Sequence, residues 1–161
     1  MRIAQIEDNP VVAEGVMLRF EVRWPDACVS HAQLGEHGMK MIGPENPVIV
    51  ILGLEVSDMD GFDVCAQIRS SSAIFIVVLT VRDTLEEIMK GSELGADDYM
   101  ASPFKPVEFL ARVSYGTLLR CVHVAHVQRL GLAFQQDDVA IDFARSRVCE
   151  DRESVNLGPV E

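Results

Sequence analysis

Carboxylate side chains gather at two places where an apolar, β-prone segment ends. These acidic residues are Glu7 and Asp8 after segment 2–6, and Glu55, Asp58 and Asp60 after segment 48–52. Carboxylate oxygens are ligands for hard cations such as Mg²⁺, usually together with oxygens from a substrate. Because ligands of open parallel sheets bind beyond the carboxyl ends of the strands, these two loops are where chemistry is expected.

Continuous apolar runs predict the strands that would position these loops. Val48–Leu52 and Ile74–Leu79 are too uniformly apolar for a half-exposed strand, which favours the centre of a parallel sheet covered by helices on both faces. Weaker strands are expected at 2–6, 27–31 and 98–100.

Helical spacing of apolar residues predicts a helix after each strand. The expected helices lie at 11–22, at 34–42 with interruptions at Gly35 and Gly38, at 62–69, at 84–94 and from Pro106 to about residue 120 or 130. Five strands alternating with five helices predict an α/β fold, a flavodoxin-like doubly wound parallel sheet in the order 2-1-3-4-5. Glu7 and Asp8, Gly53 and Thr80 would then meet at one edge.

The pattern changes after Gly131, where short β-like pieces replace the alternation. We expect a domain at 1–120, a helical extension or linker at 121–131 and a small antiparallel β segment at 132–161. Such a segment of about 30 residues is too small to be stable alone.

Charge and composition restrict the function further. The net charge is −11, and both 1–120 and 121–161 are acidic, so neither offers the basic surface of a nucleic-acid-binding protein. No apolar run approaches the ~20 residues of a membrane span, and no signal peptide opens the chain. The four cysteines are scattered, which favours reduced thiols and a cytoplasmic location.

Several short motifs within 1–120 carry a resemblance to a known family. They are Ile6-Glu7-Asp8, Met59-Asp60-Gly61, Val78-Leu79-Thr80, Gly95-Ala96-Asp97-Asp98-Tyr99 and Pro103-Phe104. With them the chain resembles the receiver domain of bacterial two-component response regulators, in the branch that carries a winged-helix DNA-binding domain. Residues 132–161 are similar to the start of that effector domain, and they stop where its helix-turn-helix would begin.

The resemblance implies a phosphorylation site. In the family two acidic residues hold Mg²⁺, an aspartate at the end of the third strand accepts the phosphoryl group, and a lysine neutralises its oxygens. Glu7 and Asp8 match the metal pair, and Thr80 matches the hydroxyl that responds to the phosphoryl group. Gly53 stands where the aspartate belongs, and Ser102 stands where the lysine belongs.

These two departures predict a pocket that has lost its chemistry. Gly53 offers no nucleophile and Ser102 no cation, so the resemblance implies a pseudo-receiver in which Mg²⁺ binding is weak or lost. Glu55 is close enough to the strand end to lean into the pocket as a possible metal ligand. Tyr99 matches the switch aromatic of the family, or is a half-buried tyrosine of an edge strand.

The family also implies a two-fold dimer contact. Charged residues on the last helices and strand match its pattern: Lys90, Asp97, Asp98, Glu108 and Arg112. The alternative is an ordinary solvated face. We expect a homodimer that forms without phosphorylation.

The sequence therefore predicts an atypical response regulator whose receiver dimerises to position a DNA-binding domain largely absent from this chain. Promoter DNA would be reached only through that domain. A small-molecule sensor that fills the emptied pocket is the second possibility, and a stand-alone interaction module is the third. An enzyme is not expected, because no nucleophile–base pair and no Gly-rich phosphate loop is present.

Overall fold

The computed structural model describes the backbone of residues 1–81, 84–128, 134–136, 139–142, 147–150 and 153–156, and the side chains of those up to Leu119. The chain divides into two compact units, Met1–Thr117 and Leu118–Glu161. Helix α5 (Pro106–Gln128) includes residues 121–128 of the segment at which the sequence predicts a helical extension or linker, and residues 129–131 of that segment lie outside the described residues.

The first unit is built on a five-stranded parallel sheet in the order β2-β1-β3-β6-β7. Its strands are β1 (Arg2–Ile6), β2 (Cys28–Ala32), β3 (Ile49–Gly53), β6 (Phe75–Thr80) and β7 (Asp98–Ala101). This confirms the predicted fold and strand order. Because Gly53 pairs with Leu79, and Thr80 pairs with Ala101, the predicted pocket residues end at one edge of the sheet.

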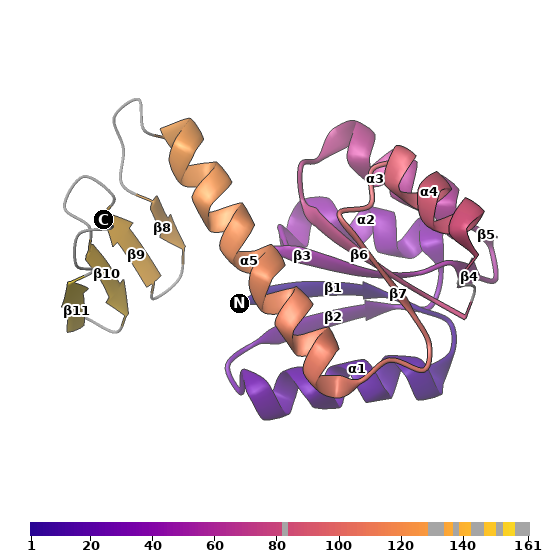
Figure 1. The fold of residues 1–161 in the computed structure, drawn as a ribbon, viewed down its shortest axis with the longest axis horizontal. Helices are drawn as coiled ribbons and strands as arrows, with labels where there is room; N and C mark the ends of the chain where they lie inside the picture. Colours follow the sequence, from indigo (N-terminus) through magenta and orange to yellow (C-terminus); the bar gives the residue numbers. More distant parts are fainter. Residues whose placement is uncertain (82–83, 129–133, 137–138, 143–146, 151–152, 157–161) are drawn as a thin grey trace. The chain divides into compact units, whose positions relative to one another are not determined.

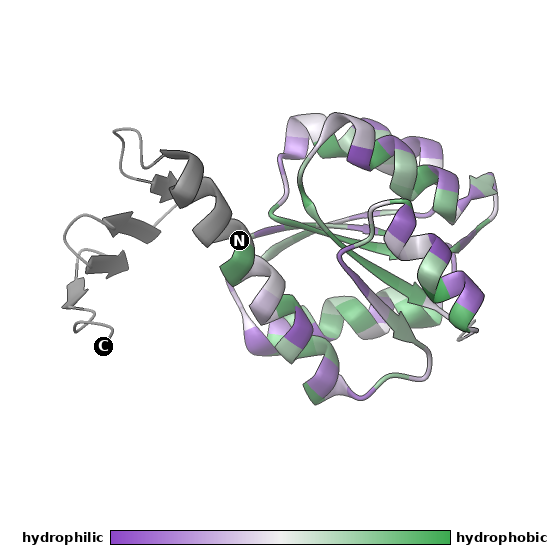
Figure 2. Cartoon of the chain, turned by 45° about the horizontal axis from the view of Figure 1, so that its top comes forward, coloured by the Kyte–Doolittle hydropathy of each residue, from purple (hydrophilic) through white to green (hydrophobic). Residues whose placement is uncertain are grey.

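Helices cover both faces of this sheet (Figure 1). The helix α1 (Pro10–Arg23) and the first turns of α5 lie on one face, and α2 (Gly35–Glu45), α3 (Gly61–Ser71) and α4 (Leu85–Glu93) lie on the other. In Figure 2 the central strands of this sheet are coloured mostly as hydrophobic, whereas the outer strands include hydrophilic segments. Continuous burial on both faces explains why β3 and β6 are apolar at nearly every position.

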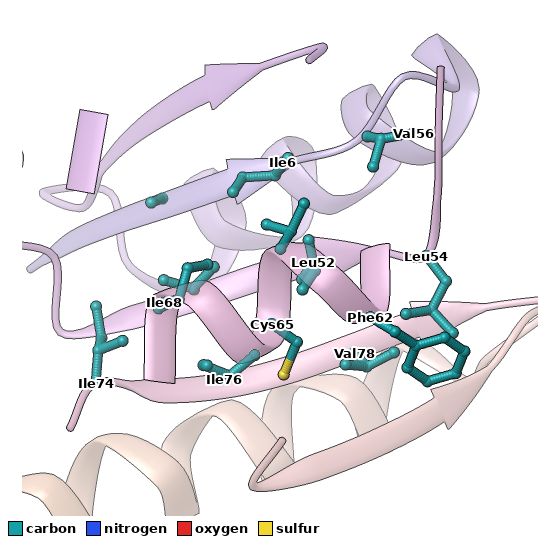
Figure 3. Close-up of a cluster of buried hydrophobic side chains, with 13 residues drawn as sticks. Ile6, Leu52, Leu54, Val56, Phe62, Cys65, Ile68, Ile74, Ile76 and Val78 are labelled. Atoms are coloured by element: carbon teal, nitrogen blue, oxygen red, sulfur yellow. The ribbon is translucent and has the colours of Figure 1, made fainter. Parts of the chain in front are cut away.

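Two hydrophobic clusters fill the two layers. On the α1–α5 side, Phe20 packs edge-to-face on Phe109, with ring centroids 5.5 Å apart. On the other side, α3 directs Phe62, Cys65 and Ile68 toward the sheet (Figure 3). These clusters hold the ends of β1, β3 and β6 at fixed positions relative to one another.

Helix α2 is continuous, contrary to the predicted interruptions. Gly35 and Gly38 are buried, and a side chain at Gly38 would overlap with Ile6. The cost of glycine in a helix is therefore offset by close packing of α2 against β1.

The acidic loop after β3 contains a short hairpin that the sequence does not predict. Strands β4 (Glu55–Val56) and β5 (Met59–Asp60) pair in antiparallel fashion. Beyond the first unit, β8 (Phe134–Gln136), β9 (Val139–Asp142), β10 (Arg147–Glu150) and β11 (Glu153–Asn156) form an antiparallel sheet in the order β11-β10-β9-β8. No helix among the described residues is long and apolar enough to cross a membrane.

Candidate functional site

The predicted pocket residues line one small cavity at the carboxyl edge of the sheet. Its volume is about 100 Å³. The residues of the sequence prediction that line it are Glu7, Asp8, Gly53, Glu55, Thr80 and Ser102. The ends of β1, β3 and β6 and the segment after β7 thus converge as the alternating pattern implies.

The carboxyl group of Glu7 lies directly over Gly53. A β-carbon built on Gly53 would be only 2.5 Å from Glu7 Oε2 and 3.0 Å from Glu7 Cδ. Glu7 is 8% exposed, and its Oε1 accepts a hydrogen bond of 3.0 Å from the backbone N–H of Asn9. The space beside Gly53 is therefore occupied by this side chain.

Burial raises the pKa of Glu7 above its ordinary value. The Asn9 N–H and His31 act in the opposite direction, whereas the neighbouring carboxylates of Asp8 and Glu55 raise the pKa further. His31 contacts the same turn from β2, because its Nε2 lies 2.8 Å from the backbone oxygen of Glu7. A buried carboxyl beside two others is energetically unfavourable when it is charged.

Asp8 is held by a residue that the sequence does not suggest. The hydroxyl of Ser57, from the turn between β4 and β5, donates a hydrogen bond to Asp8 Oδ2. Among the described residues, no three His, Cys, Asp or Glu side chains are grouped to hold a metal ion. In the structure the carboxyl group of Glu7 lies against Gly53, and that of Asp8 accepts a hydrogen bond from Ser57.

The two loop aspartates, Asp58 and Asp60, accept hydrogen bonds at the N-termini of helices and do not line the pocket. Asp58 accepts hydrogen bonds from the backbone N–H groups of Gly35 (2.8 Å) and Glu36 (3.0 Å), at the first turn of α2. The Glu36 and Gly35 N–H groups lower the pKa of Asp58. Asp60, predicted as part of a turn with Gly61, is the N-cap of α3 and accepts from the N–H of Phe62 at 2.8 Å.

Tyr99 lies half-buried against the α4 side of the core. A β-carbon on Gly91 would be 3.2 Å from the Tyr99 ring, so the ring packs closely on the backbone of α4. In the parallel pairing of β6 with β7, Tyr99 lies opposite Val78. Gly91 thus lets the Tyr99 ring lie close to the backbone of α4.

The charged residues of the predicted dimer face are paired within the chain. Arg112 contacts Asp98 at 2.6 Å and Glu108 at 2.8 Å. Asp97 pairs with Arg69 at 2.6 Å and accepts the N–H of Ile76 at 2.8 Å, so it joins α3 to β6. Lys90 lies over the ring of Phe62, 4.2 Å from its centroid.

An apolar surface accompanies these charges. Leu85, Ile88 and Met89 of α4 are exposed, as are Val107 and Tyr115 of α5. These residues are not among those predicted above, although Leu85, Ile88 and Met89 have the i, i+3, i+4 spacing of one helix face. Exposed apolar residues grouped on one helix face are typical of an interaction surface.

The chemistry available at the edge pocket follows from its lining. Among the lining residues that the structure describes, there are three carboxyl groups and no Lys, Arg or His. Gly53 has no side chain to contribute. The backbone N–H of Ser102 donates a hydrogen bond of 2.6 Å to the backbone carbonyl oxygen of Thr80. The described lining thus contains no cationic side chain that could pair with the oxygens of a transferring phosphoryl group.

Residues 3–114 match the response regulator receiver domain family, and the chain belongs to that family. The DNA-binding response regulator MtrA of Mycolicibacterium smegmatis is 32% identical over 160 residues, which cover 99% of this chain and 67% of MtrA. The chain is thus a response regulator of two-component signalling, a class that is typically non-enzymatic, and its relatives are DNA-binding regulators.

Solved structures give the same family and fold. The BeF₃-activated receiver domain of Klebsiella pneumoniae RstA aligns with a TM-score of 0.66 and 27% identity, over 73% of this chain and 98% of that one. A CheY-like receiver domain from Methanospirillum hungatei aligns with a TM-score of 0.70 at 18% identity, over 76% of this chain and 97% of that one. The second likeness concerns the fold alone.

Proposed function

We propose that this chain is an atypical response regulator whose receiver works without phosphorylation of an aspartate. The observation that carries the proposal is the pocket itself, which combines Gly53 and Ser102 with three carboxyl groups. An acceptor carboxylate must be free to attack a phosphoryl donor in line, and its product needs a counter-charge. Glu55 borders the pocket, but its position next to Glu7 adds negative charge to the pocket.

Phosphorylation by a small donor tests this proposal directly. The native chain is incubated with acetyl phosphate and Mg²⁺, and intact-mass spectrometry measures any phosphoryl increment. We expect none. A stoichiometric increment on the native chain would refute the proposal and identify Glu55 or a loop aspartate as an acceptor.

Restoring variants give the matched positive control. Gly53→Asp returns a nucleophile but leaves Ser102, and loss of a positioned charge costs on the order of 3 kcal/mol, or about a hundredfold in rate. The double variant Gly53→Asp with Ser102→Lys should therefore label faster than either single variant. Equal labelling of the double variant and Gly53→Asp would show that the missing cation is unimportant.

The proposed output is a dimer formed through α4, β7 and α5. A receiver that has lost its switch must populate the dimer-competent form unaided, since no phosphoryl group shifts the equilibrium. The apolar residues of α4 and the Arg112–Asp98–Glu108 network support this face. Sedimentation at tens of micromolar should show a dimer, and Arg112→Glu should weaken it.

DNA recognition is proposed by analogy with MtrA, which is described as DNA-binding. The residues of this chain carry net negative charge, so counterion release on phosphate contacts has no source here. We propose that the receiver positions a winged-helix domain, of which residues 132–161 form the first β portion.

A small-molecule sensor is the second candidate, and one observation favours it. A groove of about 370 Å³ beside α1 shares Val12, Val81 and Ser102 with the edge pocket. Its remaining lining is mostly apolar, with Arg19 over the Phe104 ring at 5.4 Å.

A fluorescent probe that combines an apolar body with an anion, anilinonaphthalene sulfonate, tests this candidate. Saturable binding by the native chain that is lost in Val81→Glu would favour the sensor. Identical fluorescence of both proteins would exclude this groove as the binding site.

A further inference from the structure

We propose that helix α1 pairs in parallel with the α1 helix of a second copy of this chain, through a surface separate from the dimer face of the proposed function. Four residues form this surface, named here the α1 seam: Val11, Gly15, Leu18 and Val22. Their spacing of four, three and four residues is the repeat of a and d positions with which two helices pack in a coiled coil. The seam residues therefore share one face of α1.

The α1 seam is apolar and nevertheless exposed. Val11, Leu18 and Val22 are 78%, 60% and 76% exposed. The face of α1 toward the sheet carries a second apolar set, which is buried: Ala13, Val16 and Phe20. Helix α1 is thus apolar on two faces, of which a single chain covers one. An exposed apolar stripe on a helix is typical of a surface that docks against another helix.

Charged residues along the seam decide which partner and which direction fit it. In the same repeat, Glu14 and Glu21 occupy the g positions on one border of the seam, and Arg19 occupies an e position on the other. In a parallel pair of copies, each acidic border faces the basic border of the partner. In an antiparallel pair, each border faces its own copy, so carboxylates would meet carboxylates. A second copy in parallel register is therefore the complementary partner, with Glu14 of each chain against Arg19 of the other.

Arg19 is already bent toward the place that this pair requires. Its Nη1 donates a hydrogen bond to the backbone oxygen of Gly15, which carries the guanidinium about one turn toward the N-terminus of α1. The Phe104 ring supports the guanidinium there, 5.4 Å from the ring centroid. In an in-register partner this is close to the level of Glu14. Neither Glu14 nor Arg19 has an ion-pair partner among the residues that the structure describes.

The α1 seam would add a second contact to the one already proposed. Helix α1 and helix α4 cover opposite faces of the sheet (Figure 1), so one chain can use both surfaces at once. Two different two-fold contacts on one chain join dimers into larger assemblies.

Disulfide cross-linking of the full chain tests the parallel register. The cysteines other than the buried Cys65 are first replaced by serine, and single cysteines are then introduced as Val11→Cys or Val22→Cys. Under a mild oxidant, each variant should form a covalent dimer with its own copy about tenfold faster than the control Gln67→Cys, an exposed position of α3. In an antiparallel pair, two residues at position 11 would lie about 16 Å apart along the helices. A rate equal to that of Gln67→Cys would overturn the seam, and a mixed 11–22 disulfide in place of the 11–11 and 22–22 products would overturn the parallel pairing.

Charge reversal tests the pairing of Glu14 with Arg19 in the Val22→Cys chain. Glu14→Arg alone should slow cross-linking about fivefold, because it places like charges at two symmetric sites. The double variant Glu14→Arg with Arg19→Glu should restore the rate toward that of the starting chain. Equal rates for all three proteins, or a double variant as slow as Glu14→Arg, would overturn the pairing. Arg19→Glu alone is not needed, so a loss of its contact with Phe104 does not obscure the comparison.

Met89→Gln keeps this outcome separate from the proposed dimer face on α4. Adding it to the Val22→Cys chain should leave the cross-linking rate unchanged, because Met89 lies on the other side of the sheet. A rate that falls with Met89→Gln would show that cross-linking depends on the α4 face, and would overturn the α1 seam as a contact of its own.

Discussion

Replacement of Gln5 by methionine should stabilise the receiver. Gln5 lies in the middle of β1, between His31 of β2 and Ile51 of β3, and is 0% exposed. Alternation along the strand places it on the same face as Ile3, in the layer that α1 and α5 cover. Neither amide atom of Gln5 has a hydrogen-bond partner among the residues that the structure describes.

The expected size of the effect follows from this environment. An unpaired buried polar group costs about 1–3 kcal/mol, and a swap of similar volume and shape costs less than about 1.5 kcal/mol. Methionine has the same unbranched length as glutamine and no polar hydrogen-bonding requirement. The net gain should be about 1–2 kcal/mol, which raises the Tm of a domain of this size by about 4–8 °C.

Thermal and urea unfolding of the native chain and of Gln5→Met measure this gain. Gln33→Met is the control, because Gln33 is exposed just after β2 and the same chemical change there should shift stability by less than about 0.5 kcal/mol. A lower Tm for Gln5→Met than for the native chain would refute the reasoning and show that the amide is satisfied in solution.

Glu7→Gln should raise the Tm more at pH 7 than at pH 5. Burial raises the pKa of Glu7 above 4.5, so the folded chain binds the proton more tightly than the unfolded chain does. The native chain therefore loses stability as the pH rises through that raised pKa, and the glutamine variant does not. Equal Tm differences at both pH values, measured in EDTA, would contradict this prediction. Met89→Gln should raise the dimer Kd about tenfold and Arg112→Gln about threefold or less, because apolar burial contributes more than an exposed ion pair; sedimentation equilibrium decides, and a larger effect of Arg112→Gln would reverse the ranking. The 161-residue chain should not retard DNA in a low-salt mobility shift, since it is acidic throughout; sequence-specific retardation would show a DNA-binding surface within it.

The fold could be predicted from local patterns, because those patterns record the burial of each element. The apolar runs of β3 and β6 require cover on both faces, and the alternation of strands with helices then restricts the strand order through right-handed crossovers. Local sequence signals also predicted two helix starts, the N-cap Thr84 of α4 and Pro106 in the first turn of α5.

The residues that line the candidate site could be predicted from the sequence for the same reason. Strand ends of a parallel sheet meet at one edge, so Glu7, Gly53, Thr80 and Ser102 had to come together once the strands were assigned. The proposed loss of the nucleophile and of the cation rests on the identities of Gly53 and Ser102, which need no coordinates.

Only the tertiary structure decided what these side chains do to one another. Glu7 turning onto Gly53, Ser57 binding Asp8, and Asp58 capping α2 join residues 23 to 49 positions apart in the chain. Such partnerships depend on how helices and strands pack in three dimensions, which sequence periodicity does not encode. The same holds for Arg112, whose charge the sequence suggests for a partner chain and whose guanidinium reaches Asp98 within its own.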